Sequence, residues 1–241
     1  DFGFNGDKPS HPELLDWLST RFQSGTNGST PWSIKSLHKL IMLSNTYRQS
    51  STFNAEAAKL DSEDRLLWRF APHRLEGEAI RDSMLSISGK LNNAIYGPSF
   101  QPFDIVTFGS AFYVQKDLDT PEMQRRSIYR INVQSAKSPF LSALDCPDPS
   151  TKTPRRSIST TPIQALELMN NSFVDRSCKA LANWISQSTS KPSDQILKAF
   201  ELTLGRYPTA TEMADQLKFV ADHKLENLCW ILFNSTEFLY V

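Results

Sequence analysis

The sequence lacks a long apolar run, a surplus of charge and any paired-cysteine motif. Its longest apolar run, residues 228–233, is far shorter than the roughly 20 residues that cross a bilayer, so we expect no membrane span. The 26 basic residues balance 26 acidic ones. Nucleic-acid binders usually carry an excess of positive charge, so we expect no nucleic-acid partner. The three cysteines, Cys146, Cys178 and Cys229, are too widely spaced for a disulfide framework or a CxxC site.

The common catalytic and cofactor motifs are missing as well. The sequence contains no GxSxG elbow, Walker A loop, GxGxxG fingerprint or CxxCH haem attachment site. Its four histidines form no HExxH, HxH or His–Cys pattern with metal-ligand spacing. We therefore expect no metal and no cofactor in this segment, and the motifs assign no catalytic residue.

Apolar residues at spacings of three and four, together with capping signals, predict several helices in the first part of the chain. The last of these helices should run to about Leu91. Their expected starting points are Ser10, Ser33, Ser62 and Arg74.

The last third of the chain carries clearer helix signals. Thr161 with Gln164, and Thr209 with Glu212, have the spacing of a capping box. Gly205 follows a helical pattern and is typical of a left-handed C-terminal cap.

Between these blocks, Pro, Gly, Ser and aromatic residues replace the helical period over 92–160. The best strand candidates are 103–108 and 127–133, because β-prone residues gather there and alternate in the second segment. A long segment of this kind is typically functional or mobile.

These patterns predict a mainly α protein. We expect a single helical domain over 1–241, with helices in 10–91 and in 161–241. The insert 92–160 should be irregular, with room for a small β-hairpin.

One group of polar residues clusters near the end of this insert and is a candidate site. Two carboxylates three residues apart could bind a hard cation such as calcium, or they could pair with the arginines that follow. A general acid and base would require burial to separate their pKa values. We favour ion pairing that holds the loop. The group consists of Asp145, Asp148, Arg155, Arg156, Gln164 and Asn170.

A second group lies on the helix expected from Arg74. The simpler interpretation is charge pairing along a solvated helix face, since the residues stand three and four apart. In the alternative, Glu78, Arg81 and Asp82 face inward, hold the irregular segment through charge-assisted hydrogen bonds and could line a pocket. The group consists of His73, Arg74, Glu78, Arg81 and Asp82.

Several segments of the chain carry a family likeness. They are 1–3, 9–18, 36–42, 46–51, 74–89, 145–148, 155–156, 161–166 and 232–241. Together they resemble the planctomycete-type domain of unknown function fifteen-fifty-three, also called the PSD-one domain, over nearly the whole chain.

The resemblance implies the carboxy-terminal part of a larger exported bacterial protein, located in the periplasm or at the cell surface. A cytochrome-c-like domain and a second uncharacterised domain typically precede this one, so haem c would belong to a neighbouring domain. The family pattern usually begins before Asp1, so we expect part of the domain to lie upstream. The implied partners are other domains of the same polypeptide and a cell-surface polymer or protein. The family supplies no catalytic residue.

Two classes of function follow. In the first, the domain is a non-catalytic scaffold or binding module, which we favour because no catalytic spacing is present. In the second, it is a secreted enzyme acting on polysaccharide or a similar polymer, with Asp145, Asp148, Arg155 and Arg156 near its centre. A carboxylate on the floor of an open pocket, with no arginine within ion-pair reach, would favour the enzyme.

Overall fold

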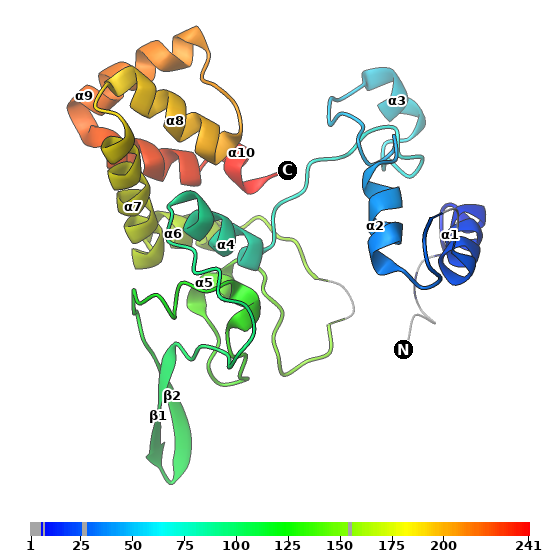
Figure 1. Ribbon diagram of the computed structural model, residues 1–241, viewed down its shortest axis with the longest axis horizontal. Helices are drawn as coiled ribbons and strands as arrows, with labels where there is room; N and C mark the ends of the chain where they lie inside the picture. The colour runs from blue at the N-terminus through cyan, green and yellow to red at the C-terminus, as the bar shows by residue number, and fades with distance from the viewer. Residues whose placement is uncertain (1–5, 7, 26–27, 154–155) are drawn as a thin grey trace. The chain divides into compact units, whose positions relative to one another are not determined.

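The computed structural model describes residues 6, 8–25, 28–153 and 156–241. Contacts group the chain into two compact units, Asp1–Pro72 and His73–Val241, which are described separately below (Figure 1). The expectation of a single domain stays a prediction.

The described residues of the first unit form three helices: α1 (Pro12–Ser24), α2 (Ile34–Met42) and α3 (Ala55–Leu60). Ser33 caps α2 as predicted, because its side chain accepts a hydrogen bond from the Ser36 backbone N–H. None of the residues described in this unit is buried, so its helices are held by local contacts and half-buried side chains.

Two helix starts expected in this unit are wrong. The N-cap of α1 is His11, which makes no side-chain capping bond, and the Ser10 hydroxyl lies 2.9 Å from His11 Nδ1 instead. The helix expected after Ser62 is absent from the described residues, where α3 precedes that position. The Asp61 carboxylate there accepts from the backbone N–H groups of Arg65 and Leu66. Such side-chain bonds compete with helix formation.

The second unit holds the core of the protein. Its helices are α4 (Gly77–Ile87), α5 (Pro139–Ala143), α6 (Pro162–Asn170), α7 (Ser172–Ser188), α8 (Pro192–Leu204), α9 (Ala210–Phe233) and α10 (Thr236–Leu239). Helix α9 packs against both α7 and α8, and α4 also contacts α7 (Figure 1). The largest side chains with no exposed surface include Ile80, Met84, Leu181, Ile196 and Phe233. Each such burial stabilises the fold by about 1.5–3 kcal/mol before entropy is counted.

The capping signals of the last third are confirmed. Both capping boxes, Thr161 with Gln164 and Thr209 with Glu212, form in full at the starts of α6 and α9. Gly205 ends α8 in the left-handed region with φ of 67°. The described chain is mainly α, as predicted.

The hairpin is also confirmed, although one of its expected strands is wrong. Strand β1 (Phe103–Phe108) pairs antiparallel with β2 (Ser110–Gln115), and the hairpin projects away from the helices of this unit (Figure 1). The expected strand at 127–133 is instead a short 3₁₀ turn, η1 (Ser127–Tyr129), followed by one isolated bridge from Arg130 to Phe100. Apart from these elements and α5, the described part of 92–160 is irregular.

Candidate functional site

The candidate site begins where an extended segment runs into α4. The His73 N–H donates to the Val241 carbonyl at 2.9 Å, and the Leu75 N–H donates to the Leu239 carbonyl at 2.8 Å. A Cβ added to Gly77 would lie 2.8 Å from Leu144 Cβ. The start of α4 is therefore pressed directly against the loop that begins at Leu144, and the helix starts three residues later than expected.

Arg74 and Asp145 form the centre of the site. Arg74 is only 6% exposed, and its Nη2 lies 2.5 Å from Asp145 Oδ2 and 3.4 Å from the Leu144 carbonyl oxygen. The Asp145 carboxylate also accepts from the Ser159 backbone N–H at 2.8 Å, the Ser159 hydroxyl at 2.7 Å and Gln164 Nε2 at 3.1 Å. Both of its oxygens are thus used within the protein.

These contacts keep Asp145 ionised. Burial alone would raise its pKa, but the bonds from Ser159, the charge of Arg74 and the bond from Gln164 together hold the pKa below its ordinary value. Asp145 has φ of 62°, a left-handed conformation that aspartate tolerates better than most residues. This backbone turn directs the carboxylate toward Arg74.

Glu78 is the second carboxylate of the site that binds several partners. Arg156 binds it with two nitrogens, at 2.7 and 3.0 Å, and also lies 3.3 Å from a Glu76 oxygen. The Cys146 thiol donates to Glu78 Oε1 at 3.4 Å. Burial, and then the negative charge of Glu78, raise the pKa of Cys146 to about 11, so the thiol is protonated at neutral pH and is not an activated nucleophile.

Members of the two polar groups predicted from the sequence therefore pair with one another, Arg74 with Asp145 and Glu78 with Arg156. We call Arg74, Glu78, Asp145, Arg156 and Gln164 the loop network. It ties the start of α4 to the segment that ends at α6. Arg156 belongs to the first predicted group and Glu78 to the second, and 78 residues separate them.

Arg156, one of the two arginines expected to pair with these carboxylates, binds Glu78 instead. Asp145 pairs with Arg74, and Asp148 pairs with Lys137, which no local spacing could indicate. Arg155 lies outside the described residues. Asn170 is exposed and donates to the Leu166 carbonyl of its own helix, so it takes no part in the loop network.

The inward-facing interpretation of the second group is correct for Arg81 and Asp82. Arg81 donates to the backbone carbonyls of Met123 at 2.5 Å and Arg125 at 3.0 Å. The Asp82 carboxylate accepts from the Ser127 N–H at 2.8 Å and its hydroxyl at 2.7 Å. These bonds hold η1 against α4, so a turn occupies the position where a strand was expected. The solvated-face interpretation is wrong at these positions.

Two pockets adjoin the loop network. One, of about 700 Å³, is mostly apolar and includes Arg74, Gln164 and Tyr240 among its lining residues. The other, of about 620 Å³, includes Glu78 and Arg156. Asp145 lines neither pocket. Among the described residues, no group of three or more His, Cys, Asp or Glu side chains is placed to hold a metal ion.

Three contributors to this region were not singled out from the sequence. Ser159 supplies two of the bonds to Asp145, Lys137 pairs with Asp148, and the Tyr240 hydroxyl lies 3.1 Å from that of Thr160. Ser159 lies only three positions after Arg156 in the chain, and this proximity could have pointed to it. The other two contacts join distant positions and had none.

Comparisons with known proteins identify the family but no activity. Neither the curated proteins nor the solved structures gave a match. In the part of the chain that the structure describes, no helix combines the length and apolar character of a membrane span. Residues 1–220 match the family PSD1, described as "Protein of unknown function (DUF1553)". The chain therefore belongs to the DUF1553 family.

Proposed function

We propose that this domain is a non-catalytic scaffold or binding module within a larger exported protein of the periplasm or cell surface. It works beside a cytochrome-c-like domain that carries haem c, and its partners are the other domains of that polypeptide and a cell-surface polymer or protein. The observation that carries the proposal is the internal neutralisation of the loop network, in which Arg74 pairs with Asp145 and Arg156 with Glu78.

A catalytic carboxylate or thiol must be able to reach substrate in a suitable protonation state. Both carboxylate oxygens of Asp145 instead accept hydrogen bonds from protein donors. The raised pKa of Cys146 keeps its side chain protonated as a thiol. These groups are arranged to hold a loop. The arrangement that would favour a polysaccharide-cleaving enzyme, an unpaired carboxylate on a pocket floor, does not occur at Asp145.

The stability of Asp145→Asn tests the proposal. Asparagine also tolerates the left-handed backbone, but it leaves the buried Arg74 without a counter-charge. We expect the free energy of unfolding to fall by about 2–4 kcal/mol, as measured by urea denaturation followed by circular dichroism. The matched control is Asp148→Asn, whose pairing with Lys137 is more exposed to solvent, and it should lower stability less than Asp145→Asn does. An Asp145→Asn variant with unchanged stability that loses a hydrolytic activity of the parent would establish the enzyme instead.

The proposed neighbour is tested on the full-length protein from its native source. We expect its intact mass to exceed that of this chain and its visible spectrum to show the absorption of haem c. A purified full-length protein without haem absorption would contradict the cytochrome association.

A further inference from the structure

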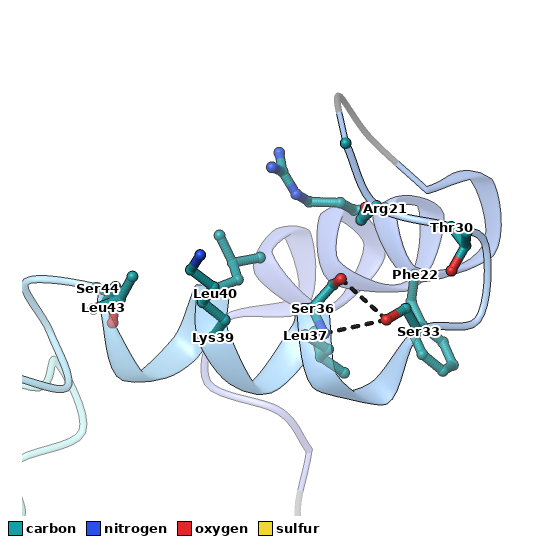
Figure 2. Close-up of a pocket in the computed structure, with 12 residues that line it drawn as sticks. Arg21, Phe22, Thr30, Ser33, Ser36, Leu37, Lys39, Leu40, Leu43 and Ser44 are labelled. Carbon is teal, nitrogen blue, oxygen red and sulfur yellow. Dashed lines mark hydrogen bonds between the residues drawn. The ribbon is translucent and has the colours of Figure 1, made fainter.

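A separate pocket lies in the first unit, where α1 and α2 face each other. Its volume is about 470 Å³. Arg21 and Phe22 come from α1, and Ser36, Lys39 and Leu40 come from α2 (Figure 2). No residue of the loop network lines it.

The ionised side chains of this pocket are all cations. Arg21 and Lys39 line it, whereas no Asp or Glu does. Within the described residues of this unit, the ion pair found joins Lys59 to Glu56, so neither pocket cation has a carboxylate partner there. The Arg21 guanidinium lies 5.0 Å from the Trp17 ring centroid, a contact that restricts its position without neutralising its charge.

Hydroxyl groups add neutral donors. Ser33 Oγ donates to Ser36 Oγ at 3.0 Å, so the Ser36 proton remains available for a further acceptor. Thr30 contributes another hydroxyl to the lining. In Figure 2 the Ser36 hydroxyl and the nitrogens of Arg21 and Lys39 lie on the same side of α2.

Apolar side chains complete the pocket. Phe22, Leu37 and Leu40 provide carbon surface beside the donors. Two unpaired cations with hydroxyl donors match an oxyanion, because charge-assisted bonds to such a group are the strong ones. The apolar surface suits a carbon skeleton attached to it. We propose that this pocket binds a small ligand that carries a carboxylate, sulfate or phosphate group on a carbon framework. The inference is independent of the loop network.

The test is isothermal titration calorimetry on the full chain at low ionic strength, with glucuronate, inorganic sulfate and uncharged glucose as probes. We expect an anionic probe to bind and glucose not to bind. Lys39→Gln and Arg21→Gln should each weaken binding of the anion at least about tenfold. Lys35→Gln is the matched control, because Lys35 lies on the same helix but does not line the pocket, and it should leave affinity within about twofold.

The relative affinities of the probes distinguish the kinds of ligand that this pocket accepts. Tighter binding of glucuronate than of sulfate supports a ligand with a sugar-like framework, and equal binding supports recognition of the oxyanion itself. Absence of binding by both anions to a folded chain, or an equal loss in Lys35→Gln and Lys39→Gln, would overturn the proposal. Circular dichroism of every variant verifies that the helices are intact.

Discussion

At the scale of single residues, the reactivity of the Cys146 thiol depends on the neighbouring Glu78 carboxylate. Its thiol donates to Glu78, and burial together with that carboxylate raises the pKa to about 11. We expect slow iodoacetamide labelling of Cys146 at pH 7, with a rate that rises steeply only as the pH approaches 11. Glu78→Gln removes the negative charge and should speed labelling at pH 8. Mass spectrometry of the labelled peptide measures the rate.

The other two cysteines provide an internal comparison for this labelling. Burial raises the pKa of Cys178 to about 12 and also raises that of Cys229, and both are buried in the core. Their labelling should follow global unfolding. Rapid labelling of Cys146 in the native protein at pH 7 would contradict the account of its environment.

Asp145 and Asp148 show the limit of sequence reasoning at this scale. The sequence marks both as polar candidates on a proline-constrained loop. It could not distinguish them, because their difference lies in Arg74, which is 71 positions from Asp145, and in Lys137. Contacts at such separations depend on the packing of whole elements, and local spacing carries no information about them.

At the scale of elements, α4 depends on a close approach at Gly77. A Cβ there would lie 2.8 Å from Leu144 Cβ, so Gly77→Ala must displace the loop that carries Asp145. We expect a loss of about 1–3 kcal/mol in the free energy of unfolding, measured by urea denaturation. A variant as stable as the parent would show that α4 is not held against Leu144.

Gly205→Ala is the matched control for this effect. No atom lies within 4 Å of a Cβ added there, and the cost comes from its φ of 67°. We expect a loss of about 1 kcal/mol from backbone strain alone. Unlike Gly77→Ala, it should leave the labelling rate of Cys146 unchanged.

Elements were predictable where their signals are local. The boxes at Thr161 and Thr209 depend on residues three positions apart, and both formed. The apolar residues after Thr161 keep helical spacing as far as Ile185, but the helix breaks at Asn171, whose side chain caps α7 by accepting from the Phe173 N–H. The alternation of Tyr129, Ile131 and Val133 suggested a strand. Arg81 instead donates to the Arg125 carbonyl and Asp82 accepts from Ser127, and the chain forms the turn η1 there. Tertiary contacts override propensity at such positions.

At the scale of the whole molecule, carboxylates paired with arginines make the free energy of unfolding depend on pH in the acidic range. Hydrogen bonds from Arg176 lower the pKa of Asp117 to about 2, and those from Arg206 lower that of Glu212 to about 2. In the unfolded chain such groups titrate near 4. As the pH falls below that value, the unfolded state binds more protons than the folded state, so stability present above about pH 4 is lost toward pH 2.

We therefore expect the urea midpoint to stay level between pH 5 and 7 and to fall progressively between about pH 4 and 2. Salt at about 0.5 M should reduce the effect, since these pairs are partly exposed and screened. Equal midpoints at pH 4 and pH 2 would show that the carboxylates have the same pKa in both states.

The central claim is that Arg74 and Asp145 neutralise each other and hold the loop in place. A double-mutant cycle with Arg74→Met, Asp145→Asn and the combined variant tests it directly by urea denaturation. We expect a coupling free energy of about 1.5–3 kcal/mol, because each single change leaves the other group buried without its partner. Additive effects within about 0.5 kcal/mol would show that the two groups do not interact, and would contradict the account.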